Sequence, residues 1–353
     1  MALNPDLKID EASLITSTLI KKHKAASAET IDAVELKTRT GQLALVLDLA
    51  QQAFARKEPA GQIVERLAGR LHELRRDVSP ALWQELIPLA QQHQVAAYLK
   101  QDPFTRWSYE KPRGYSGDAT LLDIYYKHPS AKEIVASSSE LGREIFAYTS
   151  EAASSVAGRE RREILARTVD ETAARTENAE VLAIACGHLR EAELSKALAE
   201  KRLKRWVGLD QDPISVGTVN RDRAGTAVEA VDGSVRGLLR RAYPLGTFDL
   251  VYASGLYDYL PLPVGARLLQ RAMELVKPDG EFLFANFSDE ITTDGYMETF
   301  MDWPLILRSA SDMWDIINAA VDKNHVDAEV YYGSNRNIVY GKIRKRGGPE
   351  ALA

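Results

Sequence analysis

The sequence predicts an α/β protein in which an α-helical N-terminal cap precedes a parallel sheet with helices on both faces. Three observations predict this class. Apolar residues recur at helical spacing through the N-terminal third. Past residue 177, short β-rich runs alternate with amphipathic stretches, which is typical of a doubly wound sheet. The last two runs are joined by Gly333-Ser334-Asn335, a link so short that they must form an antiparallel hairpin.

Composition narrows the function classes. The chain has 353 residues, of which 45% are hydrophobic and 27% charged, so it can bury a core of one or two domains. Its formal net charge of −5 argues against a whole-surface grip on nucleic acid or anionic lipid. One cysteine excludes an internal disulfide framework, and the six histidines show no short ligand pair, so we expect no metal site.

Targeting signals are absent from the visible pattern. The start, MALNPDLKIDEAS, has neither a basic region nor an apolar core of the secretory kind. The longest apolar stretch, from Leu43 to Ala50, is interrupted by Asp48 and is far shorter than a bilayer span. We therefore expect a cytoplasmic protein without a membrane partner.

The N-terminal region predicts helices separated by short breaks. A cap over residues 1–130 and a sheet domain over 131–353 are expected. Ser79-Pro80 is a good helix start because serine caps and proline fits the first turn. Residues 102–118 are rich in proline, glycine and aromatics without a period, which indicates a functional loop. The expected helices are Asp10–Ala28, Thr30–Phe54, Gly61–Arg75, Pro80–Leu99, Ala119–Lys127 and Ala131–Thr176.

The C-terminal region predicts seven strands, with helices between the first five. The expected strands are Glu180–Ala185, Arg205–Leu209, Thr226–Val231, Phe248–Ala253, Glu281–Phe287, Val326–Tyr332 and Asn337–Arg344. The expected helices are Leu189–Lys201, Pro213–Arg223, Ser234–Ala242 and Pro263–Val276.

Candidate ligand-binding residues follow the first two strands. In a doubly wound sheet the ligand binds beyond the carboxyl ends of the strands. Ala185 and Gly187 would let the backbone approach it closely, and the next helix would offer free N–H groups. Asp210, at the tip of the second strand, is placed to accept hydrogen bonds from two ribose hydroxyls. Helix capping by Asp210 or Asp212 is the alternative.

Candidate catalytic residues follow strands four and five. Asp258 in a partly dry pocket would have a raised pKa and could act as a base. Tyr257 or Tyr259 could orient an acceptor, although Tyr259 could equally pack against its leucine neighbours. Asn286, at the tip of strand five, could contact the acceptor or a cofactor amine. Cys186 has no evident histidine partner and is expected to be a small buried filler.

Five ordered segments together resemble class I S-adenosylmethionine (SAM) dependent methyltransferases. They are the turn after Val181–Ala185, the tip at Asp210, Asp232-Gly233, the Phe248–Val251 strand and the Lys277–Gly280 turn. Two departures are an alanine at position 183, where relatives often have an acid, and a turn with one glycine. The resemblance implies a Rossmann-like methyltransferase sheet and SAM as cofactor. It implies cofactor contacts from Ala185, Gly187, His188, Asp210, Gln211, Asp232, Gly233 and Ser254, with Asp232 near the adenine amine or capping the next helix.

A second resemblance lies upstream. Lys111-Pro112-Arg113-Gly114-Tyr115-Ser116-Gly117-Asp118 is similar to an element of bacterial enzymes of the 3-hydroxypalmitate methyl ester type, with Ser116 in place of a proline. Tyr296-Met297-Glu298 and Asp302-Trp303 resemble the insertion after strand five in that group. The resemblance implies a lid and a floor of one pocket, where Arg113 pairs with the cofactor carboxylate and Tyr115 packs against the sulfonium. A rigid domain junction is the alternative.

The resemblance implies O- or N-methylation of a small molecule by in-line displacement, which needs alignment and exclusion of water more than a base. Two alternatives stay open. The aromatic residues are also consistent with a relative of azetidine-2-carboxylate synthases, in which the SAM amine attacks its own γ-carbon. The chain could instead be a non-catalytic partner protein. Basic clusters are short and no N-P-P-Y-like motif follows strand four, so no nucleic-acid substrate is expected, while a homo-oligomer is possible.

Overall fold

The computed structural model describes residues 31–347, which group into two compact units. Unit 1 comprises Ala157–Asp289 and the chain from Ile306 onward, and unit 2 comprises residues 31–156 and Glu290–Leu305. The predicted boundary after residue 130 therefore falls inside unit 2. The expected helix Asp10–Ala28 lies outside the described residues. Between residues 31 and 347, no helix combines the length and the apolarity that crossing a bilayer requires.

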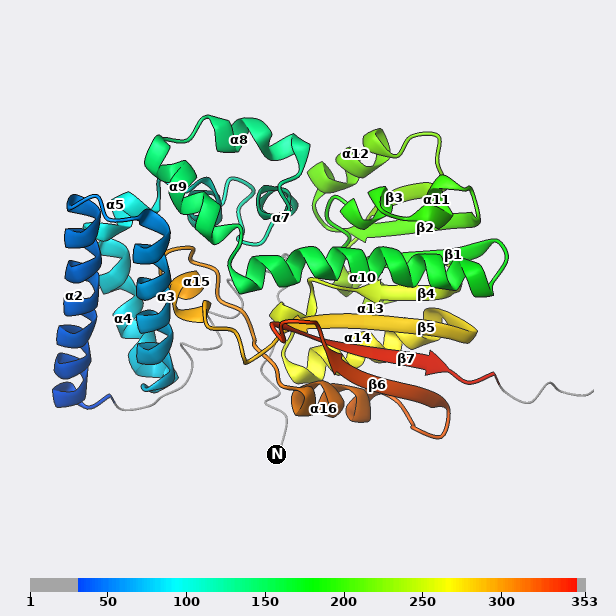
Figure 1. The fold of residues 1–353 in the computed structure, drawn as a ribbon. Helices are drawn as coiled ribbons and strands as arrows, with labels where there is room; N and C mark the ends of the chain where they lie inside the picture. The colour runs from blue at the N-terminus through cyan, green and yellow to red at the C-terminus, as the bar shows by residue number, and fades with distance from the viewer. Residues whose placement is uncertain (1–30, 348–353) are drawn as a thin grey trace, which may run out of the picture. The chain divides into compact units, whose positions relative to one another are not determined.

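Unit 1 is built on a seven-stranded sheet with the order β3-β2-β1-β4-β5-β7-β6 (Figure 1). Strands β1 to β5 are parallel, whereas β7 pairs antiparallel with both β5 and β6. This confirms the predicted methyltransferase-like fold class. The strands are β1 (Ala179–Ile184), β2 (Leu203–Asp210), β3 (Val228–Asp232), β4 (Phe248–Ala253), β5 (Val276–Phe287), β6 (Val326–Tyr332) and β7 (Ile338–Lys345).

Helices cover the sheet and supply its core. Every residue of β1 is buried, as expected for a strand in the middle of a parallel sheet. Figure 1 shows α10 in front of the sheet and α14 behind it. The helical elements of unit 1 are α10 (Ala153–Arg175, whose first turn contains the unit boundary), η2 (Arg190–Glu193), α11 (Lys196–Ala199), α12 (Pro213–Asp222), α13 (Val235–Leu239), η3 (Tyr257–Tyr259), α14 (Leu262–Leu275) and α16 (Ala310–Ala320).

Three local features of unit 1 differ from what the sequence led us to expect. The helix expected over Leu189–Lys201 is only η2 and the short α11, because Leu189 adopts a left-handed conformation and Ser195 caps a new start. The Lys277–Gly280 turn lies within β5 as an irregularity, with Asp279 at φ +61°. Helix α16 was not predicted, although Ser309 and Asp312 form a capping box at its start.

Unit 2 is helical, and two of the predicted helices, Pro80–Leu99 and Ala131–Thr176, are divided into shorter ones. The chain turns extended at His93 and divides the expected Pro80–Leu99 helix. Asp102 accepts two backbone N–H bonds and Pro103 follows it, so a helix forms inside the predicted loop. Ser139 caps a further start and breaks the expected Ala131–Thr176 helix. The helices are α2 (Ala33–Ala55), α3 (Ala60–Arg76), α4 (Pro80–Gln92), α5 (Val95–Leu99), α6 (Pro103–Glu110), α7 (Ala119–Tyr125), η1 (Pro129–Ala131), α8 (Lys132–Ala136), α9 (Glu140–Thr149) and α15 (Asp294–Thr299).

The segment after β5 enters the core of unit 2. All six residues of α15 are buried. Arg75 on α3 donates to Asp294 at 2.8 Å and to Glu298 at 2.9 Å, and the Trp83 indole donates to Glu298 at 2.7 Å. These charge-assisted bonds stabilise two buried carboxylates. Tyr296-Met297-Glu298 is therefore packed into this core, which argues against its predicted place in the lid and floor of a pocket.

Candidate functional site

The turn after β1 departs sharply from ordinary backbone geometry. Ala185, Gly187 and Leu189 have φ values of +55°, +54° and +49°. A left-handed conformation is strained for residues with a Cβ, and such strain concentrates at functional sites. The chain is thereby turned across the carboxyl end of β1, so its peptide groups face the strand tips. The approach of this backbone to a ligand, predicted for Ala185 and Gly187, stays a prediction.

Asp210 ends β2 at this turn. Its side chain is only 7% exposed. One carboxylate oxygen accepts the Gly187 N–H at 2.7 Å and the other accepts the Asp212 N–H at 2.9 Å. Burial raises the pKa of Asp210, while these two hydrogen bonds and nearby His188 oppose the rise. A carboxylate oxygen can accept more than one hydrogen bond, so Asp210 keeps acceptor capacity for a ligand hydroxyl.

Asp212 and Ser234 cap the helices that follow β2 and β3, so the predicted capping alternative holds for Asp212 but not for Asp210 or Asp232. Asp212, not Asp210, caps α12 by accepting the Ile214 N–H at 2.9 Å. Asp232 pairs with Asp210 in the β2–β3 register and is exposed, while Ser234 caps α13. The Gly233 N–H donates to the Asp210 carbonyl at 2.8 Å, so the two strand tips are joined.

Cys186 and His188 complete the turn. The Cys186 N–H donates to the Leu209 carbonyl at 3.2 Å, and burial raises the pKa of its thiol well above 9.0. A Cβ on Gly208 would lie 2.8 Å from the sulfur, so the thiol packs against a position that only glycine fits. His188 is 8% exposed. Cys186 thus packs against Gly208 as a filler, but its side chain is only partly buried, whereas a buried one was expected.

A buried cluster of ionisable side chains, which the sequence did not predict, lies next to this turn. Tyr252, at the end of β4, donates its hydroxyl to Glu191 at 2.6 Å. Burial raises the pKa of Glu191, and the positive charge of Arg161 opposes the rise. Arg161, on α10, is 3% exposed and donates to the Ser254 carbonyl at 2.8 Å. The strand tips of β1 and β4 therefore share one charged network.

At the tip of β5 the polar groups bind one another. The Asn286 amide donates to the Phe287 carbonyl at 2.8 Å and to the Ile306 carbonyl at 2.7 Å, and its oxygen accepts from Arg308. Arg308, 4% exposed, also donates to the carbonyls of Tyr257 at 2.6 Å and of Leu260. These contacts occupy the amide, which argues against the predicted role of Asn286 in contacting an acceptor or a cofactor amine.

Tyr257 and Asp258 also belong to this cluster at the tip of β5. Tyr257 is fully buried, with its ring 4.5 Å from that of Phe284 and its hydroxyl donating to the Gly265 carbonyl at 3.3 Å. This placement makes it a packing residue, contrary to the predicted catalytic role. Asp258 accepts the Phe287 N–H at 2.7 Å, and burial raises its pKa to about 6. The raised pKa fits the prediction for Asp258, and its role as a base stays a prediction.

Arg113 and Tyr115 belong to unit 2, where the loop that carries them is fixed by its ends. Lys111 pairs with Asp302, and Ser116 donates to the Asp302 carbonyl at 2.8 Å. The two segments that resemble one enzyme group are thus in contact. The predicted contacts of Arg113 with a carboxylate and of Tyr115 with a sulfonium stay predictions.

The groups at the β1–β2–β3 edge are mainly hydrogen-bond acceptors. The buried Asp210 carboxylate can accept hydrogen bonds from ligand hydroxyls, and the exposed Asp232, its partner in the strand register, can accept one from a ligand amine. Within residues 31–347, no three side chains of the metal-binding kinds group together as ligands.

Comparison with solved structures supports the fold. A structure from Bordetella parapertussis, described as a possible exported protein, is similar to the chain with a TM-score of 0.52 at 15% identity, over 90% of this chain and 100% of that one. The N-methyltransferase NodS from Bradyrhizobium japonicum WM9, in complex with S-adenosyl-L-homocysteine, gives a TM-score of 0.40 at 14% identity, over 65% and 100% of the two chains. No protein-family model and no curated protein matches the sequence. The Bordetella similarity establishes the fold alone, in agreement with the strand order.

Proposed function

We propose that the protein binds S-adenosylmethionine at the β1–β2–β3 edge of unit 1 and transfers its methyl group to a small molecule. The observation that carries the proposal is Asp210, a buried carboxylate held by the Gly187 and Asp212 N–H groups at the tip of β2. The seven-stranded order of the sheet supports it, because a ligand of this fold binds beyond the carboxyl ends of the strands.

Each residue at the edge has a defined task in this proposal. Asp210 accepts hydrogen bonds from the ribose hydroxyls, and the turn from Ala185 to Gly187 brings the backbone against the cofactor. Gln211, Asp232 and Gly233 flank the adenine, and His188 and Ser254 lie toward the amino-acid end. SAM supplies an activated methyl group with its own leaving group, so the chain has to align donor and acceptor and exclude water. Asp258 would accept a proton where the acceptor carries one.

The decisive test compares Asp210→Asn with Asp249→Asn. Asp249 also accepts a backbone N–H, from Glu180 at 2.8 Å, but it lies at the opposite end of the strands. Removing the charge at Asp210 weakens the bonds to the ribose, so calorimetry should show SAM affinity lower by about ten- to a hundredfold. Asp249→Asn should leave the affinity unchanged. Equal affinities for Asp210→Asn and the unaltered protein would refute the site.

The products formed from SAM distinguish the reaction classes. Methyl transfer yields S-adenosylhomocysteine and depends on an added acceptor. Intramolecular cyclisation yields methylthioadenosine without one, and its appearance would replace the proposed transfer by the cyclase alternative. Saturable SAM binding with neither product, across O- and N-nucleophile acceptors, would favour the non-catalytic alternative.

A further inference from the structure

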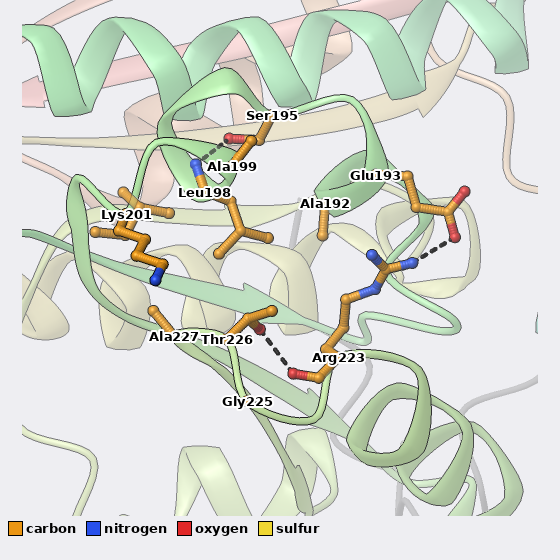
Figure 2. A pocket seen from close by; sticks show the side chains of 11 residues that line it. Ala192, Glu193, Ser195, Leu198, Ala199, Lys201, Arg223, Gly225, Thr226 and Ala227 are labelled. Atoms are coloured by element: carbon orange, nitrogen blue, oxygen red, sulfur yellow. Dashed lines mark hydrogen bonds and ion pairs between the residues drawn. The ribbon is translucent and has the colours of Figure 1, made fainter.

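A pocket lies at the amino end of β2, the opposite end of the strand from Asp210. Its volume is about 480 Å³, and it is formed where β2 begins and the chain enters β3 (Figure 2). Leu203 lines it and starts the strand that Asp210 ends. At about 3.3 Å per residue, the two ends of β2 are about 23 Å apart, so this pocket is separate from the proposed cofactor site.

The pocket has an apolar floor and two cations. Leu198, Leu203 and Ala227 contribute the apolar surface. In Figure 2, Lys201 and Arg223 stand at opposite sides of the pocket with Leu198 between them. A volume in this range, largely apolar with a few convergent polar groups, is typical of small-molecule sites.

The charges of the lining leave a positive excess. The Glu193 carboxylate is already neutralised, since Arg190 donates to it at 3.0 Å and Arg223 at 2.6 Å. Arg190 also pairs with Asp222 at 3.2 Å. Lys201 has no ion-pair or hydrogen-bond partner for its ammonium among residues 31–347. Arg190, Arg221 and Arg223 share these two carboxylates, so the positive charge of Lys201, which lines the pocket, is not balanced by them.

Arg223 adds an independent observation. Its side chain is 19% exposed, and its Nε is buried without a hydrogen-bond acceptor in the described part of the chain. A buried N–H without an acceptor is costly, and native proteins satisfy nearly all such groups. A ligand oxygen would satisfy it.

We propose that this pocket binds a small organic carboxylate, whose anionic group bonds to Lys201 and Arg223 and whose apolar body covers Leu198 and Leu203. A bare inorganic anion would leave the apolar floor in water, and an organic cation would meet the excess positive charge. The proposal does not depend on the proposed function, because it concerns other residues at the other end of the strand.

Hexanoate is the probe. Acetate, which lacks the long apolar chain, and 1-hexanol and hexylamine, which lack the carboxylate, are the control ligands. Titration of the full chain, monitored by ligand-observed NMR, should show that hexanoate binds saturably. Its affinity should be at least about tenfold higher than that of acetate, 1-hexanol or hexylamine. Tighter binding of hexylamine, equal binding of acetate, or no saturable hexanoate binding would each overturn the proposal.

Lys201→Asn is the first variant, and Lys57→Asn is its matched control. Both lysines are exposed and have φ of +57°, a conformation that asparagine tolerates, so the two substitutions change charge equally at equal backbone cost. Hexanoate affinity should fall about tenfold in Lys201→Asn and stay unchanged in Lys57→Asn. A similar fall in both variants would show a non-specific charge effect and overturn the proposal.

Ala227→Leu tests the apolar part with the charges retained. The added side chain fills part of the cavity, so the affinity for hexanoate should fall while acetate binding stays the same. A circular dichroism spectrum identical to that of the unaltered protein verifies the fold of each variant. Undiminished hexanoate binding in Ala227→Leu would place the ligand elsewhere and refute the site.

Discussion

The carboxyl edge of the sheet has two halves that differ in how their polar groups are satisfied. At the β1–β2–β3 half, Asp210 is held by two backbone N–H groups and Asp232 is exposed. At the β4–β5 half, Asn286 and Arg308 bind one another and four neighbouring carbonyls. The first half keeps acceptor capacity for a ligand, whereas the second is closed on itself.

This difference indicates which half of the edge can bind a ligand and which half supports the fold. A side chain whose hydrogen bonds all go to the protein cannot bond a ligand without losing one of them, and a buried group left unpaired is costly. The β4–β5 half therefore acts as a rigid wall that fixes the strand tips. The β1–β2–β3 half is the part of the edge in which a substitution should alter ligand affinity before it alters stability.

The largest effect should come from breaking the wall with Arg308→Met. The variant leaves the Leu260 carbonyl and the Asn286 oxygen without the arginine donor, and it leaves the Tyr257 carbonyl with only the Leu260 N–H. Loss of one partner from such a buried network costs about 3–5 kcal/mol, which chemical denaturation followed by circular dichroism would measure. Arg346→Met, at an exposed ion pair with Asp327, should behave as the unaltered protein. Similar losses in both variants would show that the wall has no special stability.

The second effect concerns the pH dependence of the wall. Burial raises the pKa of Asp258 from 3.8 to about 6. Because the folded state holds the proton more tightly, this carboxyl contributes its full stability below pH 3.8 and loses that contribution as pH rises through 6. At pH 7 the ionised group costs about 3 kcal/mol relative to a neutral one, at 1.36 kcal/mol per pKa unit.

Asp258→Asn is the neutral mimic, and its amide oxygen can still accept the Phe287 N–H. Relative to the unaltered protein, its free energy of unfolding should therefore rise by up to about 3 kcal/mol between pH 4 and pH 7. Urea denaturation at each pH measures the difference. A difference between the two proteins that stays constant with pH would mean that Asp258 titrates normally and does not belong to a dry wall.

The sequence predicted the strands and the position of Asp210 at a strand tip, because both depend on short, continuous stretches of the chain. Long apolar runs gave the parallel strands, and an acid directly after such a run gave Asp210. The wall was not predictable because its partners are far apart in the chain. Arg308 is 22 residues from Asn286, and Arg161 is 93 residues from Ser254, with no motif to join them. Tyr257 and Asn286 looked available in the sequence because burial is not visible there.

Helix boundaries in unit 2 failed for a related reason. The periodicity of apolar residues continues past His93 and Ser139, yet the chain turns extended at His93 and Ser139 caps a new helix. Asp102 shows the opposite case, since its cap and the following proline start a helix within an aperiodic stretch. Capping by a single side chain thus decided where helices begin and end, whereas periodicity indicated only that helices were present.

The smallest effect is expected when a glycine of the β1–β2–β3 half, Gly233, is compared with Gly217 at an ordinary surface position. A Cβ at Gly233 would lie 2.3 Å from the Leu209 Cδ1 and 3.0 Å from the Tyr243 ring, so Gly233→Ala forces a buried leucine beside Asp210 to move. Such overpacking costs about 1–3 kcal/mol. In contrast, a Cβ at Gly217, in the exposed face of α12, meets nothing within 4 Å, and Gly217→Ala should stabilise the protein by about 0.5–1 kcal/mol. Thermal unfolding should show a loss of stability in Gly233→Ala and a gain in Gly217→Ala. Titration with SAM then shows whether either substitution changes the affinity for SAM. If Gly233→Ala lowers stability without weakening SAM binding, the β2–β3 tip supports the fold and the adenine lies elsewhere.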